Sequence, residues 1–480
     1  MNKHKSRTSG QLSLQMLILG IIAIIVLSGF LVWVDSFIKS TIRFAERAQA
    51  FTIAEAGIEY YRWHLAHAPT DYKDGTATSG PYIHPYYDKN GVEIGEFELD
   101  ITPPPVGSTV VTVKSTGNLV NDPSIEKIIE VKMAIPSFVK YAAAIHSSVR
   151  FGAGTEVFGE VHSDGGIRFD GLAHNLVTSA VATYTDGDYD ACTYLSHGVH
   201  TCVNPDDPAP PTPVPSRPDV FEVGRQFPVP GLDFIGLTED LAQIASSSQQ
   251  GGFYRASSTA LGYDVVLKTN DTFDIYKVTG LTPPPSGCTN YLGQSGWGTW
   301  SISSETLLGN YPLPANGLIF LGDNVWVRGQ INTARLTIAS ARFPDTSKSS
   351  ITINQDITYT NQDGQDVIGL IAQDNINIGW NSDTDLHIDA AVMAQSGRVG
   401  RYYYRPPSWF SNRCSPHVYK DTITLNGMIA SNLRYGFAYT DGTGYNIRNL
   451  VYDIDLLFSP PPSFPLTSDS HEIISWKEIK

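Results

Sequence analysis

Charged residues are scarce in this sequence, and cations are scarcer than anions. Asp, Glu, Lys and Arg make up 17% of the 480 residues, well below the roughly 25% of an average globular protein. The net charge is −15, so the chain lacks the basic face that nucleic-acid binding requires. We therefore expect no nucleic-acid partner. The length is more than one core usually needs and predicts two or three domains.

The sequence signatures of common enzyme classes are missing. There is no G-x-S-x-G, H-E-x-x-H, P-loop or G-x-G-x-x-G motif in the chain. Asp385, His387 and Asp389 alternate along a predicted strand, so their side chains point to one face. Such a cluster could serve a polysaccharide-cleaving enzyme, but it is more often the solvated face of a strand. We predict no catalytic residues, no cofactor and no enzyme activity.

Cysteine is rare, with four residues in the whole chain. Cys192 and Cys202 are close in sequence, which predicts a disulfide between them. Cys288 and Cys414 then pair by elimination. Disulfides persist in oxidising compartments, so the pairing favours an exported domain.

Two segments have the composition of a metal site. One is an alternative to the first disulfide, a zinc site from Cys192, His197, His200 and Cys202. Its spacing matches no familiar zinc finger. The other begins like a calcium-binding loop, with Asp186, Asp188 and Asp190. It lacks the Gly and Glu that such a loop carries further along, so we predict a solvated acidic turn and no metal.

A single long apolar run lies near the N-terminus. Leu12 to Val34 contains no charged residue and one strongly polar residue, Gln15. As a helix it spans ~34 Å at about 1.5 Å per residue, enough to cross the ~30 Å hydrocarbon core of a bilayer. A secretory signal has a shorter apolar region. We therefore predict a helix retained in the inner (cytoplasmic) membrane, with a cytoplasmic N-terminus and the bulk of the chain exported.

The helical pattern continues beyond the apolar run. An apolar stripe repeats every seven residues, at Phe44, Phe51, Ile58 and Leu65. The first proline after this stripe is Pro69, which predicts one helix over residues 11–66. Such a stripe suits packing against another helix or against the chain's own exported domain.

The run Ala50 to Glu59, Ala-Phe-Thr-Ile-Ala-Glu-Ala-Gly-Ile-Glu, follows the apolar helix at a characteristic distance. In this combination the chain resembles the type 4 pilus assembly PilX N-terminal family, a family of minor-pilin-like proteins. The resemblance covers the leader and the helix. It implies a helix-assembly motif formed by Phe51, Ala54, Glu55, Ala56 and Gly57.

The same resemblance implies a prepilin-type leader, residues 1–10, removed between Gly10 and Gln11. It also implies insertion of the helix into a pilus-like bundle, with the membrane and other pilin or pseudopilin subunits as partners. Pilins usually carry Glu five residues into the mature chain, where this sequence has Gln15. An amide can hydrogen-bond there but cannot neutralise a charge buried in lipid.

Beyond the helix the sequence predicts a mainly β fold. Three alternating segments at 93–101, 109–117 and 127–133 predict a small antiparallel sheet. Further on, Ile145–Phe151 is echoed by Val161–Phe169, and the Ile-Ala-Gln of Ile371 is echoed at Met393 and Ile429. Short recurring strands with Asn and Gly at the corners predict a right-handed parallel β-helix. A β-sandwich is the alternative.

We predict seven segments. They are the leader (1–10), the helix (11–66), a small antiparallel β region (67–135), a first solenoid region (136–204), a Pro-rich linker (205–235), an insertion with a short helix and strands (236–310), and the main solenoid region with the C-terminal tail (311–480). The aromatic segment 401–410 predicts a binding patch for sugar or protein, at Tyr402, Tyr404 and Trp409.

These patterns support three hypotheses about function. The first is a minor-pilin-like structural component of a type IV pilus or pseudopilus that displays a large β domain at the cell surface. The second is a membrane-anchored adhesion or carbohydrate-binding protein that uses the aromatic patch on a surface glycan. The third is the surface polysaccharide-cleaving enzyme considered above.

Overall fold

The computed structural model describes residues 9–105, 108–188, 192, 194–234, 237–344, 347–468 and 470–479. The chain divides into two compact units. The first comprises Met1–Pro103, Val111–Met133 and Ile473–Lys480, and the second comprises Pro104–Val110 and Ala134–Glu472. Residues 1–8 of the predicted leader lie outside the described part of the chain.

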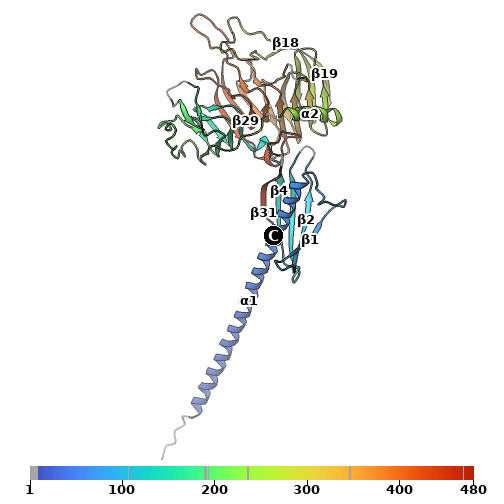
Figure 1. The fold of residues 1–480 in the computed structure, drawn as a ribbon, viewed down its shortest axis with the longest axis vertical. Helices are drawn as coiled ribbons and strands as arrows, with labels where there is room; N and C mark the ends of the chain where they lie inside the picture. The colour runs from blue at the N-terminus through green and yellow to red at the C-terminus, as the bar shows by residue number, and fades with distance from the viewer. Residues whose placement is uncertain are drawn as a thin grey trace, which may run out of the picture. The chain divides into compact units, whose positions relative to one another are not determined.

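The first unit begins with α1 (Ser9–His67), one unbroken helix of 59 residues (Figure 1). No proline interrupts the sequence before Pro69, and residues just before a proline are disfavoured in helical geometry, so the helix ends at His67. Its C-terminal half has a buried stripe: Ala50, Ile53, Ala54, Ile58, Tyr61 and Leu65. The observed helix thus contains the whole predicted range, 11–66, and extends it by two residues at the start and one at the end.

This stripe packs on a five-stranded sheet. Its strands, in spatial order, are β1 (Tyr82–Tyr87), β2 (Glu93–Thr102), β3 (Val111–Leu119), β4 (Glu126–Ala134) and β31 (Glu472–Glu478) (Figure 1). The pairs among β1 to β4 are antiparallel. Along β3 every second residue is buried, as the period of two in a strand requires for a sheet with one covered face.

Two of the five strands differ from the prediction. The sequence indicated β2, β3 and β4 but not β1, and it placed the C-terminal tail in the main solenoid region. Instead β31 joins the sheet beside β4, where Lys127 pairs with Glu478 and Lys477 pairs with Glu130 at 2.7 Å. Lys127 and Glu478 are 351 residues apart in the chain, and pairing over such a separation leaves no local pattern in the sequence.

Most of the second unit is a stack of coils of short parallel strands, called the solenoid below. Strands of successive coils pair on three faces. The first face contains β20 (Leu318–Leu321), β22 (Arg335–Ser340), β25 (Val367–Ala372), the end of β27 (Asp385–Ala394), the end of β29 (Tyr419–Ser431), β5 (Ala143–Ile145), β8 (Val161–Ser163) and β11 (Val177–Ser179).

The second face contains the beginning of β21 (Val325–Ile331), β23 (Ile351–Ile353), β26 (Ile376–Ile378) and β28 (Val399–Arg401), with β6 (Val149–Phe151), β9 (Ile167–Phe169) and β14 (Val199–His200) as a separate group. The third face contains the end of β21, β24 (Ile357–Tyr359), the beginnings of β27 and β29, β30 (Gly444–Tyr452), β7 (Thr155–Phe158) and β10 (Leu172–Ala173). Strands of this kind enclose one apolar core.

The coils do not stack in the order of the sequence. Ala143 of β5 pairs with Ile429 of β29, and Thr155 of β7 pairs with Arg448 of β30. The early coils of the unit therefore follow directly on its last coils, and residues of both belong to one buried apolar cluster. The two predicted solenoid regions, 136–204 and 311–480, are one stack.

The sequence echoes correspond closely to the observed registers. Val149 pairs with Ile167, and Ile371 pairs with Met393, as the repeats predict. The start of the first echo is displaced by two residues, because Ile145 pairs with Ser163 and Val161 pairs with Ala143. The third echo is shifted by one residue, because Ile429 pairs with Val392. A shift of one residue reverses the face that a side chain occupies, and Ile429 points with Val392 into the core while Met393 packs on the outer side.

Additional elements cover or extend the solenoid. The outer side of the first face is covered by α2 (Leu237–Gly251), η1 (Phe138–Lys140) and α3 (Asp455–Phe458). β17 (Gly262–Leu267), β18 (Thr272–Leu281) and β19 (Ile302–Pro312) form an antiparallel extension, and β17 also pairs in parallel with β21 (Figure 1). β16 (Phe253–Arg255) pairs with β20, and β12 (Thr183–Thr185) pairs with β13 (Leu195–His197).

The Pro-rich segment 205–235 is not a linker between domains. Val220 and Phe221 are buried in the solenoid core, and β15 (Arg225–Gln226) pairs in parallel with β11. Asp207 forms a buried ion pair with Arg225. Proline excludes regular strands over much of this segment, yet its few apolar residues dock on the last coil, so it is part of the second unit.

The predicted fold class is confirmed: the chain is mainly β, with a long apolar N-terminal helix and a β-helix-like stack of parallel strands. Sandwiches are built from antiparallel sheets, and the parallel registers of the solenoid do not fit that alternative.

Candidate functional site

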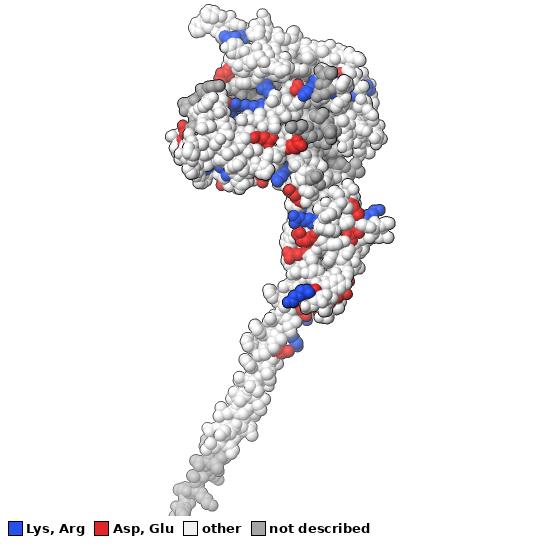
Figure 2. Space-filling model, in the orientation of Figure 1, with Lys and Arg blue, Asp and Glu red and all other residues white. Residues whose placement is uncertain are grey.

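The first half of α1 is an exposed apolar surface. All side chains from Leu12 to Trp33 are exposed, including Gln15. By length and composition the helix is able to cross a membrane, and none of its apolar window is buried. Figure 2 shows no Lys, Arg, Asp or Glu on the visible face of this half. The first charges after the run are Asp35 and Lys39, which form an exposed ion pair of 2.7 Å.

The second half of α1 docks closely on the sheet through glycines. A Cβ atom at Gly57 would lie 2.3 Å from the Ser115 Oγ and 2.9 Å from the Phe97 ring. A Cβ atom at Gly117 of β3 would lie 2.2 Å from the Ala50 carbonyl oxygen. Helix and sheet thus approach more closely than any side chain at these two positions would allow.

The predicted helix-assembly motif is divided between two environments. Ala54 and Gly57 are buried against the chain's own sheet, so they are not available to a second helix. Phe51 is half-buried, and its ring centroid lies 6.0 Å from that of Trp476 in β31. Glu55 is exposed. Ala54 and Gly57 therefore serve the docking of α1 on its sheet, whereas Ala56 is half-exposed and Glu55 remains accessible.

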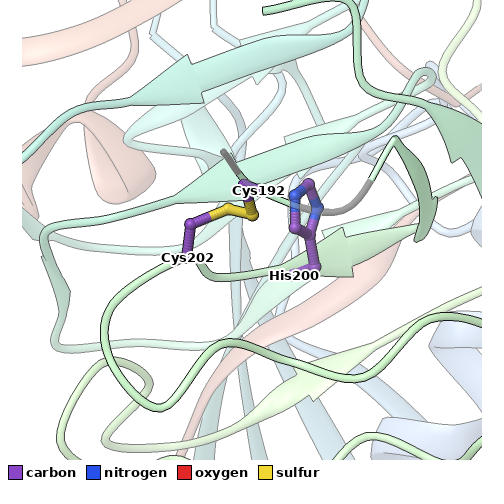
Figure 3. A group of neighbouring side chains, drawn as sticks. All are labelled: Cys192, His200 and Cys202. Atoms are coloured by element: carbon purple, nitrogen blue, oxygen red, sulfur yellow. A yellow bond between two sulfur atoms is a disulfide. The ribbon is translucent and has the colours of Figure 1, made fainter. Parts of the chain in front are cut away.

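The four cysteines form the two predicted disulfides, Cys192–Cys202 and Cys288–Cys414. His200 lies beside the first, and the possible ligand atoms of these three residues lie within 4.8 Å of one another (Figure 3). Cysteine binds zinc as a thiolate, and the two sulfur atoms of a disulfide are not thiolates. His197 contacts the Thr212 carbonyl oxygen at 2.8 Å instead. The oxidised chain thus lacks the ligands of the zinc alternative.

Asp186 and Asp188 of the acidic segment lie beside cationic or basic side chains of the chain. Asp188 pairs with Arg434 at 2.6 Å and with Arg150 at 3.2 Å. Asp186 lies 3.4 Å from the His200 Nε2. Burial raises the pKa of the Asp188 carboxyl, but the hydrogen bond and charge of Arg434 outweigh burial, so this pKa lies below its ordinary value. The third carboxylate of the calcium-like pattern, Asp190, lies outside the described residues.

The alternating acids around His387 have structural contacts. The His387 Nε2 lies 2.8 Å from the Asp389 Oδ1. Asp389 is 2% exposed, and its Oδ2 accepts a hydrogen bond of 2.9 Å from the Tyr359 amide. Asp385 is exposed on the same strand. Both Asp389 oxygens are thus used by donors within the chain, which supports the structural interpretation over catalysis.

The predicted aromatic patch does not form. Tyr402 and Tyr404 are each 1% exposed and pack in a small core with the Cys288–Cys414 disulfide. The Tyr404 hydroxyl donates to the Gly298 carbonyl at 2.6 Å. Trp409 is 95% exposed, at the tip of a tight turn. Of the three predicted residues, only Trp409 is accessible to a ligand.

A polar groove of about 730 Å³ lies on the second unit, and no sequence pattern predicts it. It is lined by β17, β19, β21 and the corners that follow β23 and β26. Arg328 contacts two carboxylates in it, Asp264 at 2.9 Å and Glu305 at 3.4 Å. Asp264 interrupts the otherwise apolar strand Tyr263–Leu267, which is the one local clue to the groove.

The two carboxyl groups interact with each other as well as with Arg328. Within the described part of the chain, no N–H or O–H donor reaches the buried Asp264 Oδ1 and Glu305 Oε2. Burial raises the pKa of Asp264 despite the contact with Arg328. Burial, with the charge of Asp264, raises the pKa of Glu305 as well. Both shifts favour a proton shared between the two groups.

A buried lysine lies in the same groove. Lys420 is 4% exposed and donates a hydrogen bond to the Ser382 carbonyl oxygen. Burial, with the charge of Arg401, lowers the pKa of Lys420 to about 8. Burial lowers the pKa of His417 below its ordinary value as well, with the charge of Lys420 adding to the shift. Lys420 therefore remains mostly cationic near neutral pH, while His417 is neutral.

Comparisons with known proteins add little to this geometry. No protein-family model matches the sequence, and no curated protein matches it. Among solved structures, the competence-associated pilin ComZ from Thermus thermophilus matches over 90% of this chain and 98% of its own, at 13% identity and a TM-score of 0.30. A TM-score this low does not establish a shared fold.

Proposed function

We propose that the chain is a minor-pilin-like structural component of a type IV pilus or pseudopilus. The observation that carries this proposal is α1, a single helix of 59 residues with two different halves. Its first half is apolar and exposed, and its second half is docked on an antiparallel sheet. A long apolar helix available for a pilus-like bundle is what the resemblance to the PilX N-terminal family implies.

An exposed apolar helix needs an apolar environment. In water, surface of this extent favours association. A bilayer accepts the apolar side chains, and the helix satisfies its own backbone hydrogen bonds there. In a filament, the helices of other subunits would replace the lipid. Gln15 adds no buried charge in either environment. The same segment therefore suits a membrane-stored subunit and an assembled one.

The two disulfides support export of the solenoid, because such bonds persist in oxidising compartments. In this proposal the N-terminus starts in the cytoplasm, α1 crosses the inner membrane, and the sheet of the first unit lies outside together with the whole second unit. The solenoid is then displayed on the cell surface or the filament. We propose a structural role without enzyme activity, since the acids predicted as alternatives are occupied by contacts within the chain.

Filaments sheared from the producing cells test the proposal. We expect the chain in the sheared fraction together with the major pilin. The Gly10→Leu variant, blocked at the predicted cleavage site, should stay in the inner membrane, while the neighbouring Ser9→Ala variant should enter filaments. Recovery of the unaltered chain only from washed inner membrane, with the major pilin in the filaments, would refute an assembly role.

A further inference from the structure

Two aromatic side chains project from the second unit at a tight turn, residues 408–411, called the aromatic tip below. Ser408 and Ser411 pair with each other through two backbone hydrogen bonds, of 2.7 and 3.2 Å. The two residues between them, Trp409 and Phe410, are 95% and 94% exposed. Among the described residues no other large apolar side chain is as exposed, not even those of the apolar half of α1. The tip therefore offers two rings to a partner outside the chain.

The base of the aromatic tip is fixed by buried contacts. Cys414 is fully buried, and its disulfide with Cys288 joins the tip to the segment 286–297. The Trp380 Nε1 donates to the Cys414 carbonyl oxygen at 2.7 Å. The Cys414 amide in turn donates to the Arg405 carbonyl oxygen at 3.2 Å. Because the base is ordered in advance, little conformational entropy is lost when the tip binds a partner.

The charges beside the aromatic tip are positive. Arg405 and Arg413 are the only charged residues in the segments 403–416 and 286–297, although the whole chain carries a net charge of −15. Within the described residues neither arginine forms an ion pair with a carboxylate. The Arg405 guanidinium lies 4.2 Å from the ring centroid of the exposed Tyr291. The surroundings of the tip are therefore a cationic site on an acidic chain, which attracts an anionic surface.

The size and shape of the aromatic tip favour a lipid surface over a protein or a small molecule. An aromatic side chain buries about 150–250 Å², so two rings remove roughly 300–500 Å² from water. Each partner in a standard protein interface buries more, about 800 Å². Small molecules bind in concave sites, whereas the tip projects. A bilayer accepts projecting rings without a matching shape, and tryptophan is enriched at the level of the lipid headgroups.

We propose that the aromatic tip binds the surface of a bilayer that carries anionic lipids. Trp409 and Phe410 enter the boundary between headgroups and acyl chains. Arg405 and Arg413 lie at the level of the anionic headgroups, which attract basic side chains. The second unit thus has an interaction surface of its own, and this surface does not depend on assembly into a pilus.

Quenching of tryptophan fluorescence by brominated lipids tests the proposal on the full-length protein. The protein is reconstituted in nanodiscs, which hold α1. Anionic lipids brominated on their acyl chains are supplied either in separate vesicles or in the nanodisc itself. In one of these two arrangements they should quench the wild type more than Trp409→Phe, which keeps a ring at the tip but lacks the tryptophan that reports insertion. Brominated phosphatidylcholine alone should give a smaller difference.

Substitutions separate the contribution of the rings from that of the charges. Phe410→Ser removes one inserted ring, so the lipid concentration for half-maximal quenching should rise about tenfold or more. Arg413→Gln removes one cation and should raise this concentration about fivefold. Phe158→Ser, an exposed ring of the solenoid, is the control and should leave it unchanged. Equal quenching of wild type and Trp409→Phe in both arrangements, or quenching that Phe410→Ser does not alter, would overturn the proposal.

Discussion

Replacing Gly117 by Ala probes the docking of α1 on its sheet. Gly117 has no positive φ angle, so the strand itself accepts alanine. The new Cβ would lie 2.2 Å from the Ala50 carbonyl oxygen and 2.5 Å from the Ala54 nitrogen, far closer than the ~3.5–4.0 Å of favourable contacts. Both are backbone atoms of the helix, so no side chain can rotate to make room.

The expected cost follows from two opposing effects. Overpacking a core costs about 1–3 kcal/mol, while Gly→Ala stabilises by about 0.4–1 kcal/mol through the unfolded chain. Because the helix backbone is rigid, we expect the overpacking cost to lie near the upper end of its range. The free energy of unfolding of the unit should then fall by about 2 kcal/mol. Gly57→Ala should cost less, because its clash is partly with the rotatable Ser115 hydroxyl and alanine favours the helix.

Hydrogen-exchange mass spectrometry on the full-length protein in detergent measures this effect locally. If the free energy of opening of the unit falls by about 2 kcal/mol, the amide hydrogens that exchange through this opening should exchange about 30-fold faster. We expect this increase in peptides from residues 50–66 and 111–133, with solenoid peptides as the internal control. Thr116→Ala, on the opposite face of the same strand, should have little effect. Equal exchange in Gly117→Ala and Thr116→Ala would refute the close docking of helix and sheet.

Three further predictions follow from buried contacts. Tyr404→Ala should lower the free energy of unfolding by about 3–5 kcal/mol, whereas Trp409→Ala should change it by less than about 0.5 kcal/mol, since only Tyr404 is buried; calorimetry measures both. The hydrogen bond to Asp389 raises the pKa of His387. The stability that His387 adds is therefore complete below its ordinary pKa of ~6.5 and is lost as the pH rises through the raised pKa. In denaturant titrations, the free energies of unfolding of wild type and His387→Gln should become equal above that pH. Ending the chain at His471 removes β31, which should speed exchange in β4 and leave solenoid peptides unchanged; unaltered exchange in β4 would show that β31 adds no stability.

Local patterns in the sequence predicted the elements whose causes are local. The apolar run and the absence of proline give α1, and alternation gives β2, β3 and β4. The repeats gave the solenoid with two registers correct. The place of β31 beside β4, and of β5 beside β29, could not be predicted, because these pairings join distant segments whose own patterns fit several partners.

The functional residues were harder to predict for the same reason. The disulfides followed from few cysteines and short spacing. The aromatic segment predicts a surface patch at Tyr402 and Tyr404, because aromatic side chains suit both ligand sites and cores. Only the packing of the folded chain separates the two cases. The groove brings together Asp264, Glu305 and Arg328 from three strands, and no single stretch of sequence shows their proximity.

Mass spectrometry of the first peptide of the native protein tests the assembly proposal most directly. A pilin-like subunit should lose residues 1–10 and begin at Gln11, with a methylated N-terminus in the assembled form. A chain that still begins at Met1 or Asn2 in cells with active pili would contradict the proposal and would make α1 a simple membrane anchor.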